Sequence, residues 1–539
     1  MRATLTLACL VLALPVLGVL GAWVATDASA WAVLVHQAGT VLPGYALQSV
    51  LLAAGVALGV TLLGAGSAAA VTLFDFPLRR SFEWALLLPL AMPAYVLAYA
   101  WTDALQYSSP LHGTLRAWTG RREALWPDVR SLWGAVILFV LCLYPYVYLL
   151  TRTALGERAV QLMEAARLLG AGTRRRIVEV ALPLARPAIT AGVALALMET
   201  LADYGVGAYF GLTTFSTGIF KAWLVMNDGV AAAQLASALL AVVALLLAAE
   251  RMAQRRLRFA ASRSGALHAA DARPLRLRGA AAAFAVALCT LPVALGFVLP
   301  VLWLAWMLWQ EAHNAELGLP LARFAAWAWT SFRLAGSAAL LAAALALALA
   351  FALRQRSGLL LQASARVLSL GYAVPGAVMA IGILLPMGWL QQRWPQAPIA
   401  AAVTGTLLGV MVAYLSRFSA VALQSVEAGY ARVPMAVDET ARMLGARPWR
   451  LFVQLHAPLL RRSSLAAALL VFVDVMKELP ATLVLRPFGA DTLAVVAFNF
   501  ARDERLGEAA LPSLAIVAVG LIPVMLLSRA LRTGEPAAT

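Results

Sequence analysis

Twelve apolar runs of membrane-spanning length recur along this chain of 539 residues and restrict it to a narrow set of folds. About 20 apolar residues cross a bilayer as a helix, and segments of this length satisfy their backbone in lipid only as helices. The composition agrees, because 62% of the residues are hydrophobic and 13% are charged, whereas soluble proteins average about half and about a quarter. We therefore expect an all-α polytopic membrane protein with about 12 transmembrane helices. The runs lie near residues 5–25, 46–70, 84–106, 131–151, 187–208, 232–250, 279–309, 333–353, 365–390, 398–418, 463–484 and 511–529.

The positive charge of the chain is distributed as membrane topology requires. The formal net charge is +16, but the basic residues form no stripe with interleaved aromatic residues, so we expect no nucleic-acid partner. Most of the 42 Lys and Arg residues fall in alternate gaps between the runs, above all in 152–186, 251–278 and 417–462. Cytoplasmic loops carry such an excess, which predicts that both termini are cytoplasmic. The first run, 5–25, exceeds the roughly 7–15 apolar residues of a signal peptide, so we expect it to be retained as a helix.

One polar segment occurs twice. "EAARLLGAG" at 164–172 returns as "ETARMLGAR" at 439–447, and 11 of 26 positions are identical between 164–189 and 439–464. We expect two duplicated halves, and six helices in each would make them parallel repeats. The domain organisation that we predict is a first half at 1–250 with its repeated loop at 157–187, a basic cytoplasmic linker at 251–278, and a second half at 279–539 with its loop at 432–462.

Each repeated loop lies between the fourth and fifth helices of its half, on the cytoplasmic side. Apolar residues at helical spacing, such as Leu162 and Leu169, predict a short amphipathic helix. Gly170 and Gly445 suit the left-handed residue that ends such a helix. We expect a basic second helix that stops near Pro183 or Pro458, so that each loop forms a compact knob.

The two segments resemble the EAA loop of the permease subunits of binding-protein-dependent ABC importers. They share its Glu-Ala-Ala start, a Gly six residues after the Glu and a Pro thirteen residues after the Gly, although Thr440 replaces the middle Ala in the second copy. The resemblance implies the ABC type I importer permease fold in a bacterial inner membrane. It also implies a cytoplasmic ABC ATPase dimer and a periplasmic substrate-binding protein as partners. The ATPase-coupling residues that it implies are Glu164, Ala165, Ala166, Arg167 and Gly170, with Glu439, Thr440, Ala441, Arg442 and Gly445.

The chain lacks the residues that would hydrolyse ATP. A phosphate-binding loop needs Gly-Lys followed by Ser or Thr, and the only lysines, Lys221 and Lys477, follow Phe220 and Met476. Motifs for zinc or for a nucleophilic serine are also missing. We therefore expect a transport subunit without enzyme activity and without a cofactor of its own, driven by a separate ATPase.

Acidic residues lie deep in the fifth apolar run of each half. Glu199 and Asp203 are four residues apart, and Asp474 and Glu478 repeat this spacing, so each pair would share one face of a helix. Acids inside a membrane are costly and usually mark functional sites. One interpretation is a translocation pathway lined by carboxylates, which hard cations favour. The alternative is structural, with Lys477 or an Arg pairing with some of these acids. No metal ligand is assigned.

The same segments resemble the ferric-iron branch of this importer class. The stretches at 199–223, "ETLADYGVGAYFGLTTFSTGIFKAW", and at 473–512 carry the resemblance, although Glu478-Leu479-Pro480 departs from the Asp203-Tyr204-Gly205 pattern. The resemblance implies Fe(III) delivered by the binding protein, which would dock on outer loops such as 208–231 and 485–510. A permease for thiamine, a polyamine or an oxyanion remains open, although the acids argue against an anion path.

Rivals outside this class also remain. A proton-coupled secondary transporter would show acids in the membrane, and a non-transporting scaffold would need no pathway. Neither of these two classes of protein would explain the two repeated loops. Co-purification with an ATPase separates the first rival from an importer.

Overall fold

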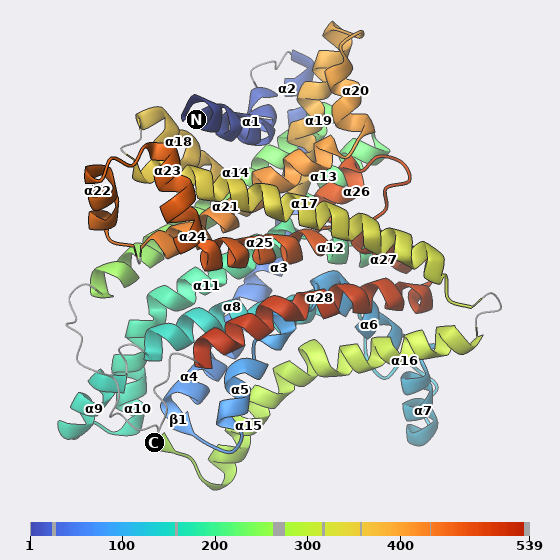
Figure 1. Ribbon diagram of the computed structural model, residues 1–539. Coiled ribbons are helices and arrows are strands. Elements are labelled where there is room, and N and C mark those ends of the chain that lie inside the picture. The colour runs from blue at the N-terminus through green and yellow to red at the C-terminus, as the bar shows by residue number, and fades with distance from the viewer. Residues whose placement is uncertain are drawn as a thin grey trace. The chain divides into compact units, whose positions relative to one another are not determined.

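The computed structural model describes residues 2–23, 28–156, 160–261, 275–314, 318–355, 358–431 and 433–532, and it is built almost entirely of helices (Figure 1). Up to residue 276 the elements are α1 (Arg2–Gly21), α2 (Ala28–Gly39), α3 (Leu42–Val60), η1 (Thr61–Ala65), α4 (Gly66–Leu73), β1 (Phe74–Asp75), α5 (Arg79–Ala85), η2 (Leu88–Ala91), α6 (Ala94–Leu105), α7 (Pro110–Thr119), α8 (Leu132–Ala154), α9 (Val160–Leu168), α10 (Thr173–Arg176), η4 (Ile177–Ala181), α11 (Leu182–Ala202), α12 (Gly205–Tyr209), α13 (Phe215–Phe220), η5 (Lys221–Val225), α14 (Gly229–Ala261) and β2 (Leu275–Arg276).

The remaining elements follow the basic linker, of which residues 262–274 lie outside the described part of the chain. They are α15 (Gly279–Val293), η7 (Ala294–Val298), α16 (Leu299–Asn314), α17 (Leu321–Arg354), α18 (Leu359–Leu368), η8 (Gly371–Ala373), α19 (Gly376–Arg393), α20 (Pro398–Gly405), α21 (Leu408–Tyr430), α22 (Met435–Met443), α23 (Pro448–Arg450), η9 (Leu451–His456), α24 (Ala457–Leu459), α25 (Arg461–Met476), α26 (Pro480–Leu485), α27 (Leu493–Arg502) and α28 (Leu506–Arg532).

Nine helices in the described residues are long and apolar enough to cross a membrane, or ten if one bent pair is a single span. The bent pair covers the expected run 84–106, where Arg79–Ala91 and Ala94–Thr119 meet at 91° beside Pro93. The all-α polytopic expectation is confirmed. The expected run 398–418 is divided between α20 and α21. Two further runs, 365–390 and 463–484, are also not single long helices. Pro375 and Pro480 stand where these runs break, since proline cannot donate the backbone hydrogen bond that continues a helix.

The chain forms two compact units, and neither is continuous in sequence. One unit contains 1–40, 218–240 and 319–499, and the other contains 41–217, 241–318 and 500–539. Each unit therefore holds the central helices of one repeat together with the first helix of the other repeat. The division at the linker remains a prediction about the duplicated sequence.

In the unit that holds most of the second repeat, α17, α21 and α25 pack against one another, and α17 runs beside α25 (Figure 1). Small residues allow the close contacts, because alanines such as Ala338, Ala342 and Ala346 form the buried face of α17. The first helix, α1, packs against α18 and α19. Gly382 of α19 accommodates this approach, since a Cβ there would collide with the carbonyl oxygen of Pro15.

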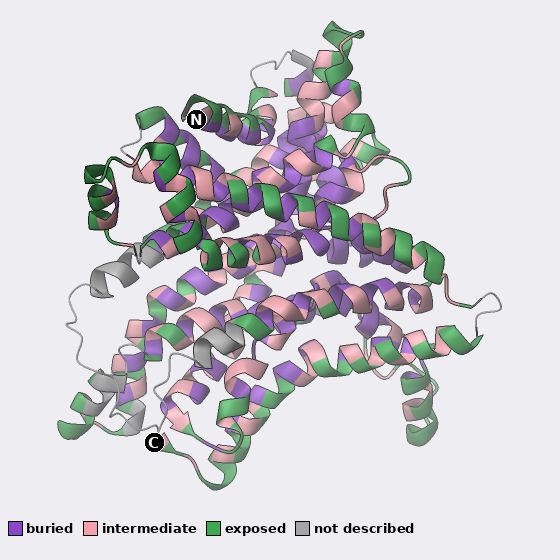
Figure 2. Cartoon of the chain, in the orientation of Figure 1, coloured by how far each residue is buried: buried purple, intermediate pink, exposed green. Residues whose placement is uncertain are grey.

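In the other unit, α8 packs against α3, α4 and α11, and α28 packs against α16. A short parallel strand pair joins β1 to β2, with Phe74 beside Leu275 and Asp75 beside Arg276. The end of the basic linker is therefore attached next to the end of α4. Buried residues follow the interior faces of the long helices in each unit (Figure 2).

Candidate functional site

The repeated loops contain the expected short helices, α9 and α22, and both end in the same way. Gly170 and Gly445 have φ angles of +80° and +79°, the left-handed conformation that glycine adopts without strain. In each copy the amide of the Gly donates to a carbonyl three residues back, and the next amide donates to a carbonyl five residues back. This pair of hydrogen bonds is the Schellman motif. The prediction that these glycines end the helices is confirmed.

The tips of both helices carry exposed apolar side chains. Leu169 is 88% exposed, and its counterpart Leu444 is 84% exposed. Leu168 and Met443 beside them are equally open to solvent. Figure 2 shows α22 as a largely exposed helix. Large apolar side chains gathered on a protruding helix are typical of a surface that another protein covers.

The other residues assigned to coupling lie on the same two helices. Ala165, Arg167 and Gly170 are exposed and Ala166 is half-buried, while Glu164 lies in α9 with its side chain outside the described part of the structure. In α22, Glu439, Thr440, Arg442 and Gly445 are exposed, and Ala441 is half-buried.

The expectation that a second helix stops near Pro183 or Pro458 is wrong for the first copy. There α10, η4 and α11 follow one another without a break, and Pro183 lies in the first turn of α11. In both copies a π-helical turn, η4 or η9, ends two residues before the proline. Such a turn re-registers the backbone hydrogen bonds, so the helix can continue past a residue that has no N–H.

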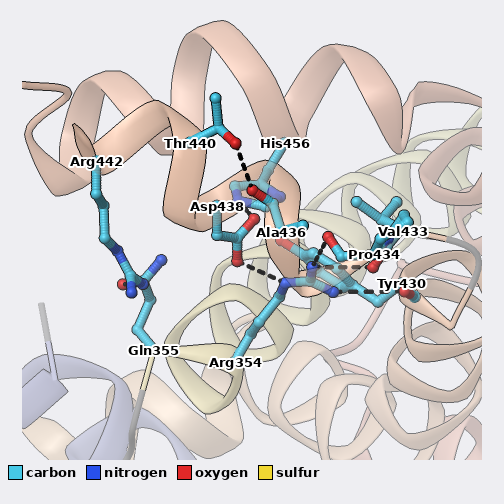
Figure 3. A network of polar contacts seen from close by, with 10 residues as sticks. All are labelled: Arg354, Gln355, Tyr430, Val433, Pro434, Ala436, Asp438, Thr440, Arg442 and His456. Atoms are coloured by element: carbon cyan, nitrogen blue, oxygen red, sulfur yellow. Dashed lines mark hydrogen bonds and ion pairs between the residues drawn. The ribbon is translucent and has the colours of Figure 1, made fainter. Parts of the chain in front are cut away.

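A buried polar network attaches α22 to the rest of its unit (Figure 3). Arg354, the last residue of α17, donates from Nε to Oδ2 of Asp438 over 2.7 Å. Its Nη2 donates to the carbonyl oxygens of Val433 and Pro434, both at 2.9 Å, and its Nη1 lies 3.5 Å from the carbonyl oxygen of Tyr430. The side chains of Arg354 and Asp438 are only 10% and 1% exposed. One guanidinium therefore joins α17, the end of α21 and the start of α22.

His456 of η9 completes this network. Its side chain is fully buried, and Nε2 lies 3.1 Å from Oδ1 of Asp438. Burial lowers the pKa of His456 below its ordinary value, and the positive charges of Arg354 and Arg442 lower it further against the opposing effect of Asp438. The imidazole is therefore neutral at neutral pH, and Arg354 supplies the charge that balances Asp438.

Sequence reasoning missed Arg354, Asp438 and His456. The missed signal lies in the repeat itself, because Asp438 and His456 correspond to Met163 and Ala181 at the offset of 275. Two apolar residues of one copy are therefore replaced by polar residues in the other.

The expectation that each acid pair shares one helical face is wrong. Helix α11 ends at Ala202, so Asp203 is extended, with φ −69° and ψ 133°. Helix α25 likewise ends at Met476, before Glu478. The second acid of each pair therefore lies in the break that follows the helix, and not within the helix.

Both of these acids cap the short helix that follows the break. Asp203 Oδ1 accepts from the amide of Val206 in α12 over 2.8 Å. Glu478 accepts from the amides of Ala481 and Thr482 in α26 at 2.9 and 3.0 Å, and from the Thr482 hydroxyl. Free amides at a helix start favour a negative charge, so these contacts fit a structural role.

The first acid of each pair lies within its helix and has different surroundings. Asp474 is 3.0 Å from the Nζ of Lys477, as the structural alternative anticipated. Glu199 is half-buried in α11. The described residues contain no group of three or more His, Cys, Asp or Glu side chains that could hold a metal ion.

The chain has two sets of membrane helices, and each set carries one exposed, Gly-capped helix. This architecture is that of a duplicated transport permease. The family model for the inner-membrane component of binding-protein-dependent transport systems matches it twice, at residues 61–259 and 342–534. The chain belongs to this family, and its two matches correspond to the two repeats. It is a multi-pass membrane protein and a transport subunit.

Individual relatives differ in how much of the chain they cover. The Fe(3+)-transport system permease protein FbpB 2 of Haemophilus influenzae is 25% identical over 83% of this chain and 82% of its own length. A permease protein of Salmonella typhimurium named for 2-aminoethylphosphonate transport is 30% identical over 30% of this chain and 58% of its own length. The molybdenum transport system permease protein ModB of Escherichia coli K12 is 31% identical over 25% of this chain and 57% of its own length.

Proposed function

We propose that α9 and α22 are the two points at which a cytoplasmic dimer of ATP-hydrolysing subunits grips this permease. The observation that carries the proposal is the pair of identically capped helices, each with an exposed apolar tip and exposed arginine beside it. In this proposal Glu164, Ala165, Ala166, Arg167 and Gly170, with their counterparts Glu439, Thr440, Ala441, Arg442 and Gly445, form the coupling surface. The chain itself carries no cofactor and no enzyme activity.

The same proposal places the chain in a bacterial inner membrane, with both termini in the cytoplasm. The excess of Arg in the segments that contain α9, the linker and α22 supports this orientation. A periplasmic binding protein would then deliver the solute to the outer loops, which include 208–231 and 485–510.

Ferric iron is the solute that we propose. The relative that covers most of this chain is named for Fe(3+) transport, whereas the relatives named for molybdenum and 2-aminoethylphosphonate match about a quarter to a third of it. Carboxylates near the breaks suit a hard cation better than an anion. In this proposal Glu199 and Asp474 face the translocation pathway, while Asp203 and Glu478 shape its wall by holding the helix breaks.

The mechanism that follows is alternating access. Binding of ATP draws the two partner subunits together, and α9 and α22 convert this closure into a movement of the membrane helices. The pathway then opens towards the loaded binding protein, and hydrolysis returns it to the inward-facing state. Broken helices suit such a pathway, because irregular backbone within a membrane is tolerated where it is buried in protein or lines a cavity.

Reconstitution with the candidate partners tests the proposal. Complexes in proteoliposomes should hydrolyse ATP faster when the Fe(III)-loaded binding protein is present, and they should accumulate iron-55. A chain with Gly170→Asp and Gly445→Asp should lose this stimulation, because both helix ends would be strained and negatively charged. Normal stimulation in that double variant contradicts the coupling role, and uptake driven by a proton gradient without ATP supports a secondary transporter.

A further inference from the structure

The two repeats differ at the junction between the coupling helix and the membrane helices. Tyr430, Asp438 and His456 of the second copy correspond to Leu155, Met163 and Ala181 of the first copy at the offset of 275. The Tyr430 and His456 rings lie 5.4 Å apart beside the Arg354–Asp438 pair. The same place in the first copy is an apolar cluster of the buried residues Leu73, Leu155, Ala181 and Ala185.

Two of the arginines near the first junction contact other elements in the described part of the chain. Arg152 at the end of α8 pairs with Glu83 of α5 over 3.0 Å. Arg79 donates to the carbonyl oxygen of Val71 and lies 3.5 Å from the same Glu83. These contacts attach α5 to α4 and α8, whereas Arg354 attaches the coupling helix itself.

The two kinds of junction resist movement differently. Apolar contacts are non-directional, so their free energy depends on the area buried and not on one fixed orientation of the packed groups. The Arg354 contacts are directional, charge-assisted and shielded from water, and separating α22 from α17 would strand a buried arginine and a buried carboxylate. Helix α22 is therefore held to α17 in one geometry.

We propose that Arg354, Asp438 and His456 are positioning residues that make α22 move as one body with α17. The second loop then transmits the closure of the ATPase subunits more tightly than the first loop does. This inference rests on the proposed function, and it adds that the two copies couple unequally.

A graft between the repeats tests this. The apolar-junction variant combines Arg354→Leu, Asp438→Met and His456→Ala, so that the second junction takes on the apolar character of the first. Replacing a buried ion pair by apolar residues leaves no charge stranded and is often tolerated, so assembly and basal ATP hydrolysis should stay at the wild-type level. Iron transported per ATP hydrolysed in proteoliposomes should fall about five-fold, within the range by which coupling networks change linkage.

Two further variants serve as controls for the apolar-junction variant. Arg393→Leu removes an exposed arginine that also ends a helix of this unit, α19, and it should leave the transport ratio unchanged. Asp438→Asn removes one partner only, so it should lower the yield of the assembled complex. Full yield of Asp438→Asn, or a wild-type transport ratio in the apolar-junction variant, overturns the inference.

Hydrogen exchange of the unaltered complex gives a test that needs no variant. Amides of α22 should exchange about ten-fold more slowly than those of α9, because local opening of α22 must break the buried network. Equal exchange in the two helices overturns the inference and leaves the proposed function intact. If ATP hydrolysis by the wild-type complex is not stimulated by the loaded binding protein, the proposed function itself is overturned.

Discussion

At the scale of single residues, the surroundings of the four membrane acids follow their position in each pair, because the second acid caps a helix start and the first lies within its helix. Glu478 is almost fully buried, accepts two backbone amides and lies 3.5 Å from the guanidinium of Arg417. Glu199 is half-buried within a helix. A carboxylate surrounded by donors is committed to the fold, while one that is partly open can meet a passing ion.

Substitution by the amide should separate these two roles. Glu478→Gln should lower the free energy of unfolding by about 1–3 kcal/mol, because a buried arginine loses its counter-charge and a carboxylate acceptor is lost. Glu199→Gln should leave the Tm of the purified complex unchanged and slow iron uptake. Thermal unfolding and uptake measured on both variants, with the exposed Glu123→Gln as control, check this. Equal loss of stability in both would contradict the division.

At the scale of elements, two short helices carry the strongest sequence signal. Helices α9 and α22 have nine residues each, too few to be stable alone in water. Their ends are fixed by a glycine in a conformation that other residues avoid, and no atom of the described residues lies within 4 Å of a Cβ built at either position. Backbone strain, and not space, is therefore what requires glycine there.

A glycine series at the end of α22 isolates this strain. Gly445→Ala should destabilise the helix end by about 1 kcal/mol, and Gly445→Asn should cost less because Asn tolerates the left-handed region. Gly172→Ala, in the first loop but without a positive φ, should have no such cost. Amide exchange of each loop measures the effect. A loop equally protected in Gly445→Ala and wild type would show that the cap is dispensable.

At the scale of the whole molecule, the distribution of arginine predicts that both coupling helices face the cytoplasm. Their exposed tips offer labelling positions at Leu168 and Met443, and Trp118 in α7 is 90% exposed in a segment expected outside. The native cysteines, Cys9, Cys142 and Cys289, are free and buried, so background labelling should be low.

Single cysteines at these positions test the orientation. Leu168→Cys and Met443→Cys should react with a membrane-impermeant maleimide in inside-out vesicles, and Trp118→Cys should react only in intact cells stripped of the outer membrane. Reaction of either loop position from the periplasmic side would contradict the predicted topology. It would also exclude contact between these helices and a cytoplasmic ATPase.

Much of the architecture could be predicted because it depends on local patterns. Apolar run length identified the nine long helices, and the repeated Gly identified both helix ends. Hydropathy averages could not locate the breaks at Pro375 and Pro480, and the acids were misplaced because α11 ends one residue before Asp203. The polar junction was missed because Arg354 and Asp438 are 84 residues apart, and only the folded chain brings them together.

The exchange of first helices between the compact units sets an order of events during translation. Helix α1 leaves the ribosome first, but its packing partners α18 and α19 begin at residue 359. At about 5–20 residues per second, α1 waits roughly 20–70 s in the bilayer before these helices exist. A nascent chain arrested at the basic linker would therefore hold an orphan helix, a ready target for membrane chaperones and quality-control proteases.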